Sequence, residues 1–154
     1  KEIAEVAIHY GAEVPFERPD VLSDDYVGTA QVISHSAKWM VDQDWNVESI
    51  CCIYATAPLI YVADLTEAYN VFKKNGWDFV FAATEYVYPF QRSFKLQEDG
   101  SLRMFFPEYY RSRSQDLDVA YHDAGQFYWG KPQSWLEDWK IAELMFKVLQ
   151  DELV

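Results

Sequence analysis

A group of polar side chains in the second half of the chain could bind a sugar or an organic acid. It comes just before the aromatic segment AGQFYW and consists of Arg113, Gln115, Asp116, His122, Asp123 and Gln126. An Arg guanidinium suits a carboxylate, whereas Gln and Asp side chains suit ring hydroxyls. The alternative is a solvated loop followed by a core strand, with His122 as a packed or capping histidine. The polar run that leads into Gly125 and the aromatic residues weakens this alternative but leaves it open.

Two earlier loops also carry groups that could contact a ligand. Arg18 could bind a carbonyl or phosphate oxygen, and Thr29 could hydrogen-bond a base or ribose, although a turn with a helix N-cap is the simpler interpretation of that loop. Tyr54 and Thr56 offer hydroxyls beside small residues that let a ligand approach the backbone, and the alternative there is an ordinary strand-to-helix turn. Ligands of α/β proteins bind at such loops, beyond the carboxyl ends of the strands.

The sequence has no familiar motif for metal or nucleophile chemistry. Its three histidines, His9, His35 and His122, lie far apart. It contains no His-Glu-x-x-His or Cys-x-x-Cys pattern and no glycine-rich phosphate loop. Motif spacing alone therefore assigns no reaction.

The elements that would position these loops alternate between helices and apolar strands. Helical patterns cover residues 1–10, 27–41, 63–76 and 138–153, and apolar runs that predict buried strands cover 49–58, 77–86 and 124–129. This order predicts an α/β fold with a mostly parallel, three-layer sheet, in which residues 49–58 form a central strand. Residues 91–96 and 102–106 flank the turn EDGS and predict an added antiparallel hairpin. We expect residues 1–154 to form one domain.

Composition limits the class of partner. The chain has 154 residues, 50% of them hydrophobic, and a formal net charge of -12. A general nucleic-acid or anionic-membrane binder is not expected, because phosphate-backbone affinity requires clustered Lys and Arg. No apolar run approaches the length of a membrane span. The adjacent Cys51 and Cys52 suit core positions rather than a disulfide, which favours a reducing, cytoplasmic location.

Four segments, ERPDVLSDDYVGT, CCIYATAPLI, RSQDL and YHDAGQFYWG, resemble in order and spacing those of the acylneuraminate cytidylyltransferases. IYATAP and HDAGQFYWG are most similar to the branch that acts on pseudaminic acid. The resemblance implies a Rossmann-like nucleotidyltransferase fold that uses Mg²⁺. It also implies a homodimer, with the hairpin region, residues 88–118, as a dimerisation and sugar-acid lobe.

The resemblance further implies a reaction. CMP would pass from CTP to a nine-carbon sugar acid, giving pyrophosphate and a CMP-sugar for glycosylation of a surface glycan or flagellin. Residues at the nucleotide would be Arg18, Val27 and Thr29, and those at the sugar acid would be Tyr54, Thr56, Arg113, Gln115, Asp116, His122, Asp123 and Gln126. Either Arg113 or Ser114 would meet the carboxylate. The alternatives are the same fold acting on sialic or legionaminic acid, and a truncated, non-catalytic nucleotide- or sugar-binding domain.

Two elements of that family have no counterpart in the sequence. The family opens with a strand and a basic, glycine-containing loop that holds the triphosphate, and it carries two metal-binding aspartates before its last helix. Here WGKPQSWLE runs directly into DWKIAELMF. We therefore expect the triphosphate loop to precede this sequence and a segment to be missing between Glu137 and Asp138. No residue of the chain is assigned as a metal ligand.

Overall fold

The structure is a computed structural model that describes residues 2–137. Within that range the chain divides into two compact units, residues 2–50 with 131–137 and residues 51–130. The single domain expected from chain length stays a prediction. The helix predicted over 138–153 and the discontinuity predicted between Glu137 and Asp138 lie outside the described residues.

The first unit is helical. Its elements are α1 (Glu2–His9), the 3₁₀ helix η1 (Asp20–Leu22), α2 (Thr29–Asp42) and α4 (Pro132–Leu136). Helices α2 and α4 pack together, and each contributes a buried side chain, Ala37 and Trp135, that is 0% and 3% exposed. The helices predicted over residues 1–10 and 27–41 are thus confirmed.

The second unit is an α/β arrangement around a three-stranded sheet. Its strands are β1 (Ile50–Ile53), β2 (Phe79–Glu85) and β5 (Tyr121–Gly130), in the order β1-β5-β2. Helix α3 (Val62–Asn75) packs against β2 and β5 and ends at Gly76, whose φ of 65° is the left-handed conformation that favours glycine. The apolar core between helix and sheet comprises Ala68, Phe72, Val80, Ala82 and Phe127.

The sheet differs from the predicted one in its strand order. The mixed α/β class is confirmed, but β5 pairs antiparallel with β2 and lies between β2 and β1. Among the described residues β1 is therefore an edge strand rather than a central one. This strand order comes from a long-range contact, because β5 returns from a distant part of the chain to lie beside β1. At that edge the Tyr54 amide, just after β1, donates to the Gln126 carbonyl of β5 at 2.9 Å. The parallel layout stays a prediction.

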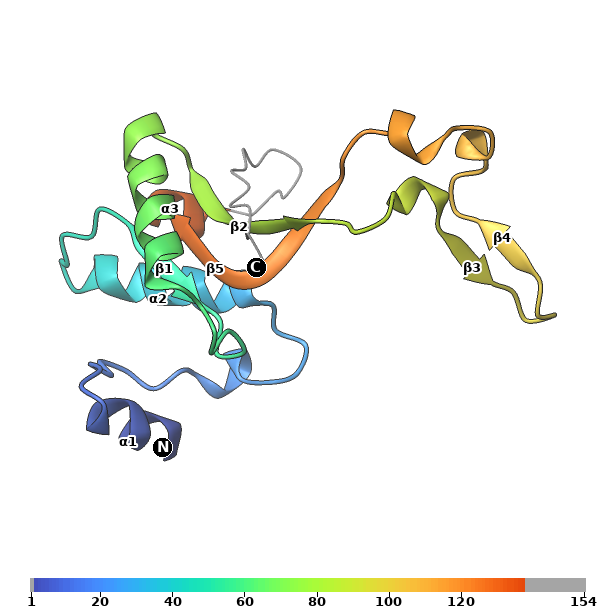
Figure 1. The fold of residues 1–154 in the computed structure, drawn as a ribbon. Coiled ribbons are helices and arrows are strands. Elements are labelled where there is room, and N and C mark those ends of the chain that lie inside the picture. The colour runs from blue at the N-terminus through green and yellow to red at the C-terminus, as the bar shows by residue number, and fades with distance from the viewer. Residues whose placement is uncertain (1, 138–154) are drawn as a thin grey trace. The chain divides into compact units, whose positions relative to one another are not determined.

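The predicted hairpin is confirmed. Strands β3 (Phe94–Leu96) and β4 (Leu102–Met104) pair antiparallel, with Leu96 opposite Leu102. The hairpin joins the ends of β2 and β5 through the 3₁₀ helices η2 (Phe90–Arg92), η3 (Pro107–Tyr109) and η4 (Ser114–Asp116) (Figure 1). Its turn is closed by Asp99, whose Oδ1 accepts hydrogen bonds from the amide and hydroxyl of Ser101 at 2.9 and 2.6 Å.

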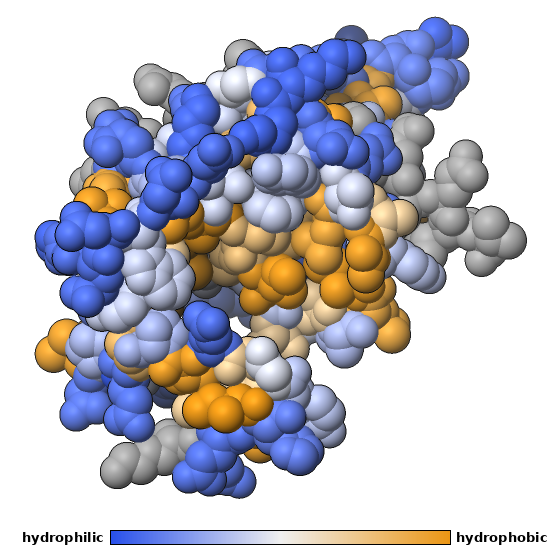
Figure 2. Space-filling view, turned by 90° about the vertical axis from the view of Figure 1, so that its left-hand side faces the viewer, coloured by the Kyte–Doolittle hydropathy of each residue, from blue (hydrophilic) through white to orange (hydrophobic). Residues whose placement is uncertain are grey.

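The described surface combines polar and apolar side chains. Figure 2 shows one face of the molecule, on which apolar residues, in orange, lie beside polar residues, in blue. On the hairpin, Phe94, Leu96 and Leu102 are also exposed. None of the helices in residues 2–137 has the length and apolar character needed to span a bilayer. Cys51 and Cys52 are a half-buried and a buried residue of β1, as predicted, and burial together with the neighbouring thiol raises the pKa of Cys51 to about 12.

Candidate functional site

The segment YHDAGQFYWG is a single strand with a bulge at its centre. Three residue pairs join β5 to β2 on each side of the bulge, ending at Phe81 opposite Tyr128 and resuming at Ala83 opposite Asp123. At the bulge, the single β2 residue Ala82 thus lies opposite four residues of β5, Ala124 to Phe127. The sequence predicted a polar loop before a strand over 124–129, whereas the structure extends that strand back to Tyr121.

The bulge decides which side chains share a face. Directly opposed residues of paired strands point to the same face, and faces alternate along a strand. Phe81 and Ala83 are two residues apart on β2 and point to the same face, so their partners Tyr128 and Asp123 share that face. Without the bulge, Tyr128 and Asp123 would lie on opposite faces, because they are five residues apart. His122 lies opposite Thr84 and hence on the other face, where its ring contacts that of Tyr86 at 4.8 Å. The structure does not bring the His122 and Asp123 side chains together.

Asp123 binds both ends of the bulge. Its Oδ1 accepts a hydrogen bond from the Gly125 amide at 2.7 Å, and its Oδ2 accepts one from the Tyr128 hydroxyl. The Tyr128 ring packs against Tyr54 and Phe81, with ring centroids 5.2 and 5.5 Å away. Asp123 and Tyr128, together called the clasp here, therefore link the bulge to the loop that follows β1.

The Tyr128 hydroxyl is held in its neutral form. Burial raises the pKa of Tyr128 well above the ordinary value of 10.0, and hydrogen bonds with Asp123 and Tyr54 raise it further. A raised folded-state pKa means that this contribution to stability is fully present below about pH 10 and is lost as the pH rises beyond it. The clasp is thus intact at neutral pH.

Gly125 lets the bulge turn. Its φ is +63°, and a Cβ added there would meet no atom within 4 Å. Gly125→Ala should therefore cost only the backbone penalty of the left-handed conformation, about 1–2 kcal/mol. Urea denaturation should show a smaller loss for Gly125→Asn, because Asn tolerates this conformation better. Equal losses for both variants would contradict the backbone explanation.

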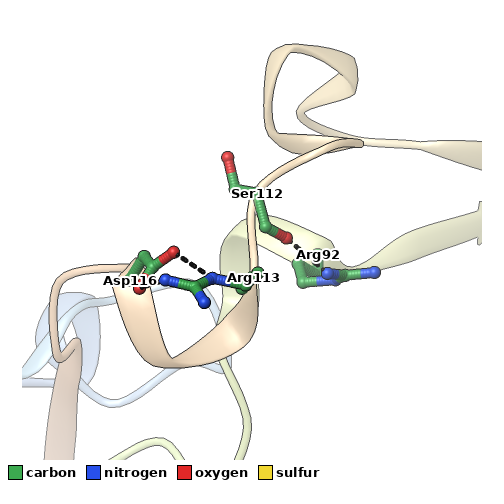
Figure 3. A network of polar contacts seen from close by, with 4 residues as sticks. All are labelled: Arg92, Ser112, Arg113 and Asp116. Atoms are coloured by element: carbon green, nitrogen blue, oxygen red, sulfur yellow. Dashed lines mark hydrogen bonds and ion pairs between the residues drawn. The ribbon is translucent and has the colours of Figure 1, made fainter.

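The predicted sugar-acid residues near the hairpin form a second polar group. Arg113 makes a bidentate ion pair with Asp116, from Nε to Oδ2 at 2.7 Å and from Nη2 to Oδ1 at 2.9 Å (Figure 3). Both side chains are exposed, and so is Gln115 between them. The Arg92 Nη1 donates to the Ser112 carbonyl at 2.6 Å and so holds the residue that precedes Arg113. The short 3₁₀ helix η4 brings Arg113 and Asp116 together.

The predicted nucleotide residues all lie in the first unit. The exposed Arg18 donates from Nε to the Ser23 hydroxyl at 3.2 Å, which accords with an ordered turn. Val27 is half-buried, and its amide donates to Asp24 Oδ1 at 2.9 Å. Thr29 is the first residue of α2, after the N-cap Gly28. Phe16, packed on the Trp39 ring at 5.0 Å, ties the start of this loop to α2.

The remaining predicted residues follow β1 or lie on the bulge. Tyr54 is half-buried and Thr56 is exposed in the loop after β1, and Gln126 is half-buried on the bulge. Tyr54, Asp123 and Gln126 are thus brought together with Tyr128. Sequence reasoning missed Tyr128 and Arg92 because each looked like an ordinary strand or loop residue. Only the register of β5 and the fold of the hairpin base give these two residues their contacts.

The described residues do not supply a metal site. Residues 2–137 contain no group of three or more His, Cys, Asp or Glu side chains arranged to hold a metal ion. Mg²⁺ prefers several oxygen ligands, commonly one or two carboxylates with substrate phosphates. The donor set expected for Mg²⁺ bound by the protein alone is thus not formed by this part of the chain.

Comparison with known proteins identifies relatives along most of the chain. No family model matches it. The chain is 47% identical over 138 residues to a pseudaminic acid cytidylyltransferase of Campylobacter jejuni, and the match covers 90% of the chain and 60% of that protein. A second Campylobacter jejuni pseudaminic acid cytidylyltransferase is 46% identical over the same shares. The chain thus spans about 60% of the length of these curated relatives.

More distant relatives extend the comparison. A Helicobacter pylori protein named pseudaminic acid cytidylyltransferase and UDP-2,4-diacetamido-2,4,6-trideoxy-beta-L-altropyranose hydrolase is 33% identical over 88% of the chain and 26% of its own length. N-acylneuraminate cytidylyltransferase A of Danio rerio is 31% identical over 86% of the chain and 30% of its own length. The resemblance predicted from the four segments is therefore confirmed: in sequence, the chain is similar to acylneuraminate cytidylyltransferases and, at higher identity, to pseudaminic acid cytidylyltransferases.

Proposed function

We propose that the protein containing this sequence transfers CMP from CTP to pseudaminic acid. The observation that carries the proposal is the 47% identity with the Campylobacter jejuni pseudaminic acid cytidylyltransferase over 138 residues. The anomeric oxygen of the acid would bond to the α-phosphorus of CTP while the bond from that phosphorus to the pyrophosphate oxygen breaks. The hydroxyl proton would leave to a base or to water. Such a reaction depends on positioning and on stabilisation of phosphate charge.

The proposal assigns the acceptor to the second unit. The sugar acid would contact Tyr54, Thr56, Gln126, Arg113, Gln115 and Asp116. His122 and Asp123 lie on β5 together with Gln126, so they belong to the same proposed acceptor site. The exposed guanidinium of Arg113 supports this assignment, since it uses two of its five N–H donors on Asp116 and so keeps donors for a second carboxylate. Arg18, Val27 and Thr29 would contact the cytidine half of CTP.

Further properties belong to the same proposal. They are a Rossmann-like, mostly parallel nucleotidyltransferase fold for the complete protein, a requirement for Mg²⁺ and a cytoplasmic location. The alternation of helices with buried strands supports the fold. The triphosphate chemistry supports the need for Mg²⁺, without a ligand assigned among residues 2–137.

A pyrophosphate-release assay on the full-length protein tests the function. CTP and Mg²⁺ would be supplied with pseudaminic, legionaminic or sialic acid in separate reactions. The expected result is the highest kcat/KM with pseudaminic acid. A preference for sialic or legionaminic acid would change the acceptor and keep the reaction. Binding of CTP or acid without pyrophosphate release would instead support a non-catalytic binding protein.

We also propose that the hairpin region, residues 88–118, forms a homodimer interface. Its cross-strand pair Leu96 and Leu102 is 72% and 66% exposed, and Phe94, two residues from Leu96 and on the same face, is 54% exposed. Contiguous exposed apolar side chains commonly mark protein interfaces.

The double variant Leu96→Asp/Leu102→Asp tests this interface. It should convert a dimer to a monomer in light scattering, because it places four like charges in a twofold interface. Val21→Asp should leave the mass unchanged, since Val21 is 80% exposed and lies outside the hairpin region. A wild-type protein that is monomeric at micromolar concentration would refute the interface.

A further inference from the structure

Both carboxylate oxygens of Asp123 are already engaged by its own strand. Oδ1 accepts from the Gly125 amide at 2.7 Å and Oδ2 accepts from the Tyr128 hydroxyl. A sugar hydroxyl that bound this carboxylate directly would have to share or displace these donors. Hydrogen bonds that involve a charged group are among the stronger ones in proteins. This geometry indicates that Asp123 shapes the site and does not contact the ligand directly.

The clasp also reaches the loop after β1. Tyr128 is 5% exposed, and its ring centroid lies 5.2 Å from that of Tyr54. The Tyr54 amide in turn donates to the Gln126 carbonyl on the bulge at 2.9 Å. Tyr54 and Gln126 are therefore connected to Asp123 through one continuous set of contacts.

We propose that Asp123 and Tyr128 are positioning residues that close the bulge of β5 and thereby hold Tyr54 and Gln126 in the arrangement that binds the acceptor. This inference rests on the proposed function. It differs from the resemblance, which implied direct contact between Asp123 and the sugar acid. It also gives a role to Tyr128, a residue that neither the motifs nor the comparisons single out.

The chain offers a matched pair of tyrosines for the test. Tyr128 and Tyr121 both lie on β5, and each donates its hydroxyl to a carboxylate, that of Asp123 and that of Glu85. Tyr121 is 42% exposed and lies beyond the bulge. Tyr128→Phe and Tyr121→Phe each remove one hydroxyl and keep the ring, so they compare the clasp with an exposed pair of the same chemistry.

Steady-state kinetics of the full-length protein give the first readout. Tyr128→Phe should raise the KM for the acid roughly tenfold, the loss expected for one hydrogen bond to a charged group, and leave the KM for CTP within about twofold. Tyr121→Phe should match the wild type in both. Asp123→Asn should impair the enzyme less than Asp123→Ala, because Asn keeps an acceptor for the Gly125 amide.

Hydrogen exchange of the backbone gives a second readout that needs no activity. Amides of residues 123–128 should exchange faster in Tyr128→Phe and in Asp123→Ala than in the wild type, and at the wild-type rate in Tyr121→Phe. Unchanged exchange in Tyr128→Phe would overturn the clasp even in an active enzyme. If these amides exchanged at the wild-type rate, and Asp123→Asn and Asp123→Ala impaired the enzyme equally, the data would instead support direct contact between Asp123 and the ligand.

The two readouts separate this inference from the function on which it rests. A wild-type protein that releases no pyrophosphate with any of the three acids refutes the proposed function. Hydrogen exchange then still decides whether Asp123 and Tyr128 hold the bulge. An active wild type with a Tyr128→Phe variant of normal acceptor KM refutes the positioning role alone.

Discussion

Replacing Phe127 by alanine is expected to lower the free energy of unfolding by about 3–5 kcal/mol, the range for truncating a buried phenylalanine. Phe127 is 0% exposed and packs with Phe72 of α3 and Val80 of β2. The substitution would leave a cavity where α3 meets the sheet, and a buried cavity adds to the loss of apolar burial. Urea denaturation followed by circular dichroism measures the loss.

A surface substitution in the same unit is the control. Val62 is 74% exposed at the start of α3, so Val62→Ala should change the free energy of unfolding by less than about 0.5 kcal/mol. If Phe127→Ala were no more damaging than Val62→Ala, the core assigned to α3, β2 and β5 would be wrong.

Removal of the Arg113 side chain should weaken binding of the acid by roughly 10- to 100-fold, as expected for loss of a charge-assisted bidentate contact. The effect should appear in the acceptor KM, with a much smaller effect on CTP, because this group serves ground-state binding of the acid. Arg113→Lys should fall between the wild type and Arg113→Ala, since it keeps the charge and loses the planar fork.

Arg111 provides the comparison for this prediction. It is an exposed arginine two positions earlier, and its replacement by alanine changes the net charge by the same amount. Arg111→Ala should therefore leave both KM values near those of the wild type. An equal rise in the CTP and acceptor KM for Arg113→Ala would remove Arg113 from the acceptor site and point to a general electrostatic effect.

Local sequence signals predicted α1, α2, α3 and the hairpin because the causes of these elements are local. Helix α3 carries Asp64 in its first turn, Lys73 and Lys74 in its last and Gly76 as its stop, and it was found within one residue of the predicted bounds. The hairpin register follows from the turn around Asp99 and Gly100. Each of these elements is set by residues a few positions apart.

The order of the strands could not be predicted in the same way. The apolar sequence ICCI of β1 predicts a central strand, but the order of strands is decided by pairing across long sequence separations. The pairing of Phe81 with Tyr128 joins residues on opposite sides of the hairpin, and no local pattern encodes it. The rule that an alternation of helices and strands predicts parallel pairing misses a strand that returns through such a hairpin.

The candidate site was predicted in residue type and missed in geometry. Arg113 and Asp116 were both chosen from the sequence, but their bidentate pairing depends on the 3₁₀ helix η4. His122 and Asp123 were placed in one group because they are adjacent, whereas the pleat of β5 directs them to different faces. Tyr128 was assigned to the aromatic core, and its hydroxyl gains a partner only because the bulge changes the register.

The bulge also bears on how proteins of this kind can diverge. Three residue pairs anchor β5 to β2 on each side of it, so the two halves of the strand are aligned independently. A residue inserted or deleted between Asp123 and Tyr128 would change the length of the bulge without shifting either set of pairs, whereas the same event in a regular strand would turn every later side chain to the wrong face. Short insertions and deletions in the bulge can thus change the surface beside Tyr54 during evolution while the pairing of β2 with β5 is kept.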